Sequence, residues 1–193
     1  TRDFERYLQS DFLKRVFART KLMAGVANAQ PYYDMLSAAE RRALRDKIQL
    51  SFAPTNPPRY ESDKPTELVV DVKNVDKLVV RVYEMNSLAF CRTNDGHLDT
   101  DVELDGLIAT HEKTIEYDRP AIERHREIIS VPEASGRGVW IVDLVGKGLR
   151  ARTLIRRGDL QTVQAHDASG TQITVLDENR QPLSSAPLCV GNP

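Results

Sequence analysis

Two neighbouring runs of alternating apolar residues, at positions 67–86, form the clearest pattern in the chain. Every second residue is apolar, at Leu68, Val70 and Val72 and then at Leu78, Val80 and Val82. Side chains of a strand alternate between its two faces, so each set can point at a common core. Asn74 and Asp76 separate the runs, and short polar side chains favour turns. The pattern predicts an early hairpin of an antiparallel sheet.

A different period governs the N-terminal residues. Apolar residues recur every four positions there, at Phe4, Leu8, Phe12 and Val16, with Leu13 and Phe17 widening the stripe. This spacing predicts a helix over residues 1–25, for which Gly25 is a suitable stop. The polar, proline-containing stretch 28–31 predicts a break. Ser37 and Glu40 have the spacing of a capping box, which predicts a second helix from Ser37 to about Asp46.

Strand-like runs bounded by turn residues fill the rest of the chain. They cover residues 48–52, 112–117, 126–131, 139–145, 149–157, 160–166, 172–176 and 182–190. Residues 139–145 are almost continuously apolar, which predicts a central strand buried on both faces. Turn signals about ten residues apart predict an antiparallel β-sandwich. We therefore expect a mainly β chain with a helical segment at 1–46, a sandwich at 47–168 and the start of a following β module at 169–193.

Composition narrows the class of protein. Of the 193 residues, 40% are hydrophobic and 28% are charged, as in ordinary globular domains. The net charge of -1 gives no general attraction to nucleic acid or anionic membranes, and no apolar run is long enough to predict a membrane span. Cys91 and Cys189 are too few for a disulfide scaffold or a four-cysteine zinc site, and leave one bridge open. Because the sequence begins at Thr1 rather than Met, we expect it to be part of a longer protein.

Three stretches resemble a known family. The run VDVKNVDKLVVRVYEMNSLAFCR at 70–92 resembles the strand pair of a macroglobulin domain, as found in the alpha-2-macroglobulin superfamily. The runs ELDGLIATHE (103–112) and RGVWIVDLVGKGLRARTLIRRG (137–158) continue the likeness, in the variant of large bacterial and protist proteins. The run ITVLDENRQPLSSAPLCV (173–190) resembles the opening of a following sandwich module. The likeness covers about residues 47–190 and excludes the predicted helices.

The resemblance implies a fibronectin-like sandwich of seven strands within a large protein that traps proteases or acts at the cell surface. It also implies an extracellular, periplasmic or cell-envelope location. The family's thioester needs a Cys-Gly-Glu-Gln run, whereas Cys91 is followed by Arg-Thr-Asn and Cys189 by Val-Gly-Asn. No long flexible bait segment is evident. We therefore expect a structural or interaction module that is not an enzyme, binds no cofactor, and has as partners its neighbouring domains and, through the longer protein, proteases.

An acidic stretch at 101–112 has the spacing of an EF-hand calcium loop. The residues at loop positions 1, 3, 5, 6 and 12 are Asp101, Glu103, Asp105, Gly106 and Glu112. Val102 and Leu104 alternate with the acids, however, and the flanking sequence favours strands over helices. The simpler interpretation is an acidic loop followed by a short strand at one end of the sandwich.

Two further groups offer ligand or nucleophile chemistry. His97, Asp99 and Asp101 are suitable ligands for a transition metal. Cys91 with His111 or His97 would make a nucleophile and its base. The simpler interpretation of His97 and its neighbouring carboxylates is a solvated turn, and that of Cys91 is a small buried hydrophobic residue. We therefore expect neither a metal site nor catalysis.

Basic residues cluster in two places. The predicted second helix carries Arg41, Arg42, Arg45 and Lys47, which fit either a phosphate-binding patch or a solvated helix face. No aromatic residues interleave with them to offer a stacking surface. On the predicted strand 149–157, Arg150, Arg152 and Arg156 share one face. That face, around Arg150–Arg157, is the candidate site of an alternative function as a β-sandwich that binds polysaccharide or an acidic ligand; otherwise it is the solvated side of an outer strand.

Overall fold

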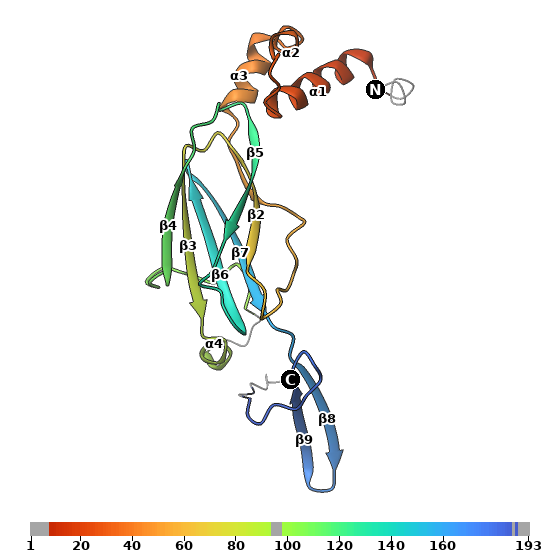
Figure 1. Cartoon of the computed structure of the whole chain (residues 1–193), viewed down its shortest axis with the longest axis vertical. Helices are drawn as coiled ribbons and strands as arrows, with labels where there is room; N and C mark the ends of the chain where they lie inside the picture. The colour runs from red at the N-terminus through yellow and green to blue at the C-terminus, as the bar shows by residue number, and fades with distance from the viewer. Residues whose placement is uncertain (1–7, 94–97, 187, 189–193) are drawn as a thin grey trace.

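The computed structural model describes residues 8–93, 98–186 and 188. The three helices before residue 47 gather at one end, a β-sandwich forms the middle, and a two-stranded hairpin lies at the other end (Figure 1). None of the helices in these ranges has the length and apolar character that a membrane crossing requires.

Three helices form the N-terminal part. The helix predicted over residues 1–25 is observed as α1 (Ser10–Met23), which begins later than predicted, since Leu8 and Gln9 are not helical. Its predicted stop is present, because Gly25 has a φ of 67°. The predicted start of α3 (Ala38–Asp46) is observed: the Glu40 amide donates to the Ser37 hydroxyl at 3.3 Å. Between them lies α2 (Gln30–Asp34), where only a break was expected. Pro31 lies in the first turn of α2, where its missing N–H removes no hydrogen bond. The helices share a small core with the sandwich, made by Ala18, Leu22, Leu36, Leu44 and Ile122.

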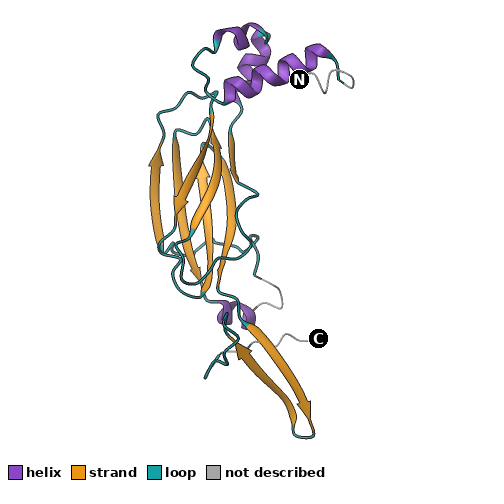
Figure 2. Ribbon diagram, turned by 45° about the vertical axis from the view of Figure 1, so that its right-hand side comes forward, coloured by secondary structure: helices purple, strands orange, loops and turns teal. Residues whose placement is uncertain are grey.

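Seven strands of the described chain form the predicted antiparallel sandwich, so the expected fold class is confirmed. One sheet has the order β1-β2-β5 and the other β4-β3-β6-β7. Their bounds are β1 (Gln49–Phe52), β2 (Glu67–Lys73), β3 (Lys77–Met85), β4 (His111–Glu116), β5 (Arg124–Ser130), β6 (Gly138–Gly146) and β7 (Leu149–Arg157). The two sheets face one another across the core, as Figure 2 shows from the side. Most of β6 is buried, in agreement with the predicted central strand.

The predicted hairpin at 67–86 is wrong in its pairing. β2 pairs with β1 and β5, whereas β3 pairs with β4 and β6, so the chain crosses from one sheet to the other at residues 74–76. Asn74 takes a φ of 54° at this crossing. Val70 of β2 and Val80 of β3, for example, are both buried in the core between the sheets. A hairpin and a crossing bury the same alternate residues, so the apolar pattern could not distinguish them.

A short helix, α4 (Ser87–Thr93), follows β3 where none was expected. Asn86 caps it, since its side-chain oxygen accepts from the Ala89 amide at 2.9 Å and its carbonyl accepts from the Phe90 amide at 2.9 Å. Asn is a favoured N-cap residue, so this signal was present in the sequence. The predicted turn at 94–96 lies outside the described residues.

The hairpin of β8 (Gln161–Asp167) and β9 (Gly170–Leu176) pairs with neither sheet of the sandwich. All of β8 is exposed. Gly158 begins the connection with a φ of 87°, and a bidentate ion pair from Arg137 to Glu178 spans it at 3.0 and 2.5 Å. In the predicted strand 182–190, the described residues form one bridge, between Pro182 and Leu176. The division of the chain at 46 and 168 stays a prediction.

Candidate functional site

The helices are fastened to the sandwich through one buried ammonium group. Lys73, at the end of β2, is 1% exposed. Its Nζ donates to the carbonyls of Leu44 at 2.6 Å, Lys47 at 2.7 Å and Ala121 at 2.9 Å. Two of these acceptors belong to the last turn and C-cap of α3, where carbonyls lack helical partners and favour a cation. Burial lowers the pKa of Lys73, and the positive charge of Lys47 lowers it further.

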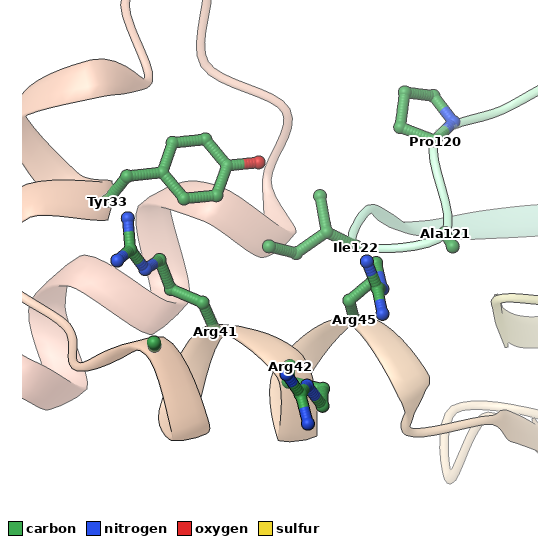
Figure 3. A pocket seen from close by; sticks show the side chains of 8 residues that line it. Tyr33, Arg41, Arg42, Arg45, Pro120, Ala121 and Ile122 are labelled. Atoms are coloured by element: carbon green, nitrogen blue, oxygen red, sulfur yellow. The ribbon is translucent and has the colours of Figure 1, made fainter.

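The same junction forms a groove beside α3. We call it the arginine groove; its volume is about 440 Å³ and it is lined by Tyr33, Ala38, Arg41, Arg42, Arg45, Pro120, Ala121 and Ile122. Figure 3 shows Arg41 and Arg45 extending from α3 toward Tyr33 and Ile122, with Pro120 beyond them, while Arg42 lies on the near side of the helix. Lys73 joins the two walls of the groove, because its ammonium group donates to a carbonyl on each side. Ala121 belongs to one wall, and Leu44 belongs to α3, which forms the other.

Positive charge in the arginine groove is largely uncompensated. Neither the Arg41 nor the Arg42 side chain has a hydrogen bond or ion pair to another described residue, and no carboxylate lines the groove as described. Arg45 donates from Nε to Asp46 at 2.9 Å, in a pair whose two side chains are more than half exposed. Such an exposed pair is worth little. Of the predicted basic helix face, Lys47 alone lies outside the groove lining, because it follows α3 as the C-cap.

A second unpartnered surface lies on α1. Phe12 and Val16 are 47% and 41% exposed, whereas Ala18 and Leu22 of the same helix are buried. We call Phe12 and Val16 the apolar α1 face. Their four-residue spacing keeps them on one side of the helix. Of the predicted stripe, this pair lies on α1 and faces away from the small core that the helices share, whereas Leu8 precedes the helix.

The arginines predicted to bind a ligand on β7 all have partners within the chain. Arg150 and Arg152 donate from Nε to the fully buried carboxylate of Asp143 at 2.8 and 3.0 Å. Arg152 also donates to the Val102 carbonyl at 3.0 Å, and Arg156 to the Leu98 carbonyl at 2.8 Å. These bonds hold the segment after residue 97 over the outer side of the sheet, so this face is not the open strand surface that was expected. A ligand-binding role for Arg150, Arg152 and Arg156 stays a prediction.

The acidic stretch at 101–112 forms part of that cover. Leu104 is buried against Tyr83 and Ile141, with Val102 packed beside it. Glu112 lies within β4 and accepts from Arg81 Nε at 2.6 Å, so it does not close a loop around an ion. Within the described residues, no three His, Cys, Asp or Glu side chains are arranged to hold a metal.

Three of the groups considered in the sequence lie outside the description. His97 and Cys189 are outside the described residues, and nothing is described of the Cys91 side chain. The expectation that His97 belongs to no metal site and Cys91 to no catalytic pair stays a prediction, and a bridge between the cysteines stays open.

Sequence reasoning missed two buried cations. Besides Lys73, Arg157 at the end of β7 is 8% exposed, and its guanidinium binds Thr66 Oγ1 at 2.6 Å and the carbonyls of Ser62 and Lys64 at 2.8 and 2.7 Å. Both residues end a strand, where a charged side chain usually reaches solvent. Apart from the Thr66 hydroxyl, their acceptors are backbone carbonyls, and all of them are distant in sequence, so no local signal identifies these two cations.

Two family models match separate parts of the chain. Residues 1–48 match the model for the Actin-binding protein F N-terminal domain, and residues 78–158 match the model for the AbpF first immunoglobulin-like domain. A similar curated protein is Actin-binding protein F of Dictyostelium discoideum, at 26% identity over 181 residues. That alignment covers 92% of this chain but 8% of the relative.

Two structures of Escherichia coli alpha-2-macroglobulin are more distant. The one spanning domains MG0-NIE-MG1 has 13% identity and a TM-score of 0.45, covering 69% of this chain and 46% of its own. The one spanning NIE-MG1 has 14% identity and a TM-score of 0.40, covering 71% and 73%. Scores this low carry no argument about function. The chain is thus similar to an N-terminal domain and an immunoglobulin-like domain that carry the name of one actin-binding protein, and its sandwich is of the immunoglobulin-like kind.

Proposed function

We propose that this chain is a non-catalytic interaction module that binds filamentous actin through its helical part. One observation carries the proposal: the helices and the sandwich match, in this order, models of two domains that carry the name of the same actin-binding protein. The identity of 26% extends across both parts. Because the chain spans 8% of that relative, its own affinity for actin is a matter for experiment.

The apolar α1 face supplies a suitable contact. An amphipathic helix commonly binds by laying side chains spaced four residues apart into a groove of its partner. Phe12 and Val16 have this spacing on α1 and are exposed. Phe17, on another side of α1, packs edge-on against Tyr32 of α2, with 5.8 Å between the ring centroids. This contact holds α1 to α2 and leaves the apolar α1 face exposed.

High-speed cosedimentation with filamentous actin tests the proposal. We expect the wild-type chain to pellet in an actin-dependent, saturable manner. The double variant Phe12→Ser, Val16→Ser removes two half-exposed anchors. At about 1 kcal/mol for burying each anchor completely at an interface, the loss is about 2 kcal/mol, or about thirtyfold in affinity.

Val163→Ser is the matched control, because Val163 on β8 is 52% exposed and lies far along the chain from the helices. It should pellet as the wild type does. If the wild-type chain stays in the supernatant at every actin concentration, the proposal is wrong. Equal losses in the double variant and the control would instead remove the apolar α1 face from the contact.

The finer resemblance to macroglobulin domains, with a role of the longer protein in protease trapping, stays a prediction from the sequence. No described residue of the chain adds support to it beyond the sandwich itself. We therefore favour actin binding, which draws on the helical part as well as the sandwich.

A further inference from the structure

We propose that the arginine groove is a docking site for an extended, acidic segment of a partner protein, in which acidic and apolar residues alternate. This site is separate from the apolar α1 face, and the inference does not depend on actin binding. It follows from the charge, spacing and wall chemistry of the groove.

The charge of the groove calls for an anionic partner. Three arginines of α3 line the groove, and the described lining offers them no carboxylate. Several other arginines of the described chain have a carboxylate partner: Arg19 binds Glu40 at 3.0 Å and Arg126 binds Asp71 at 3.1 Å. Arg41 and Arg42 lack such partners, so their donors are available for a bidentate bond to a carboxylate.

The spacing of the arginines fits an extended chain. Arg41 and Arg45 are one turn apart, so their Cα atoms are separated by about 6 Å along the axis of α3. Alternate residues of an extended strand are about 6.7 Å apart and project to the same side. Acidic residues at positions i and i+2 of a segment running along α3 would therefore meet Arg41 and Arg45 in turn. Arg42, next to Arg41 on the helix, adds a second donor at one end.

The opposite wall explains why apolar residues should alternate with the acids. Pro120, Ala121 and Ile122 form that wall with the ring of Tyr33 (Figure 3). The intervening side chains of an extended segment point away from the arginines and hence toward this wall. An inorganic phosphate or a lipid headgroup would use the arginines but would leave the apolar wall uncovered, so a protein segment fits the groove better.

Fluorescence anisotropy with a labelled Glu-Leu-Glu-Leu-Glu peptide tests the inference on the whole chain without actin. We expect saturable binding that weakens with added salt, and at least tenfold weaker binding by the double variant Arg41→Ser, Arg42→Ser. The variant Arg41→Lys, Arg42→Lys keeps the charge but loses the planar fork, so its affinity should lie between the two. A Lys-Leu-Lys-Leu-Lys peptide should not bind.

Two controls separate this site from general charge and from actin binding. Arg92→Ser, Arg124→Ser makes the same change of charge at exposed residues outside the groove and should leave peptide binding unchanged. Phe12→Ser, Val16→Ser should also bind the peptide normally, whatever it does to actin binding.

Three results would overturn the inference. They are no binding of the acidic peptide at low salt, an equal loss in the groove variant and the Arg92, Arg124 control, and binding to phosphatidylinositol bisphosphate vesicles without binding to the peptide. Equal melting temperatures of wild type and Arg41→Ser, Arg42→Ser would show that a loss of binding is not a loss of fold.

Discussion

Replacing Lys73 by Met should uncouple the helices from the sandwich. The substitution keeps the length of the side chain but removes the ammonium group that donates to three carbonyls between 2.6 and 2.9 Å. Each buried acceptor left without its donor costs about 1 kcal/mol at the lower end of the usual range. Three such acceptors give an expected loss of about 3 kcal/mol in the free energy of unfolding.

Urea unfolding followed by the fluorescence of Trp140, the one tryptophan of the chain, measures this loss at the sandwich core. Far-ultraviolet circular dichroism in the same titration follows the helices. Lys47→Met is the matched control, because it removes an exposed ammonium beside the same junction while its carbonyl stays in place. The control should change stability by less than about 0.5 kcal/mol.

Limited proteolysis adds a local readout of the same variant. With Lys73 replaced, the connection between α3 and β1 should be cleaved faster than in the wild type, since the carbonyls of Leu44 and Lys47 are released. Equal urea midpoints for Lys73→Met and Lys47→Met, with unchanged cleavage, would refute the view that this ammonium joins the two parts.

Three other perturbations have definite expected results. Arg157→Met should lower the free energy of unfolding by about 3 kcal/mol in urea titrations, because at least three acceptors lose their donor; a change below 1 kcal/mol would contradict this. Burial, aided by the positive charge of Arg119, lowers the pKa of His125 in the folded chain below its ordinary 6.5. Below pH 6.5 the unfolded chain therefore binds more protons than the folded chain, and the free energy of unfolding falls as the pH drops through that value. His125→Phe should therefore flatten the fall in urea midpoint between pH 7.5 and 5.5, and an unchanged slope would argue against it. The hydrogen bond from Arg137 lowers the pKa of Glu178 to about 2, so the stability that this ion pair contributes is present above about pH 4.5 and is lost as the pH falls toward 2. Glu178→Gln should speed proteolysis at Gly158 at pH 7, and cleavage at the wild-type rate would count against the ion pair.

Periodicity predicted the strands well but not their partners. The alternate residues Val70 and Val80 were correctly expected in a core, yet β2 and β3 belong to different sheets. Pairing depends on contacts with β5 and β6, which are distant in the sequence and leave no local mark. The capping box at Ser37 and the stop at Gly25 were readable because those signals are local.

The candidate site was only half visible in the sequence. Arg41, Arg42 and Arg45 could be recognised as one helix face, but Pro120 and Ile122, which turn that face into a groove, come from a loop about 80 residues later. On β7 the sequence suggested a site that the fold covers, because the alternating residues predicted an open basic face. There the segment after residue 97 covers the sheet, a contact that no pattern within the strand reveals.

The most direct test of the account is actin cosedimentation of the wild-type chain beside Phe12→Ser, Val16→Ser. The account predicts that the pelleted fraction of the wild type rises with actin concentration and saturates, while the variant requires about thirtyfold more actin. A wild-type pellet no larger than that formed without actin would contradict the proposal that this chain is an actin-binding module.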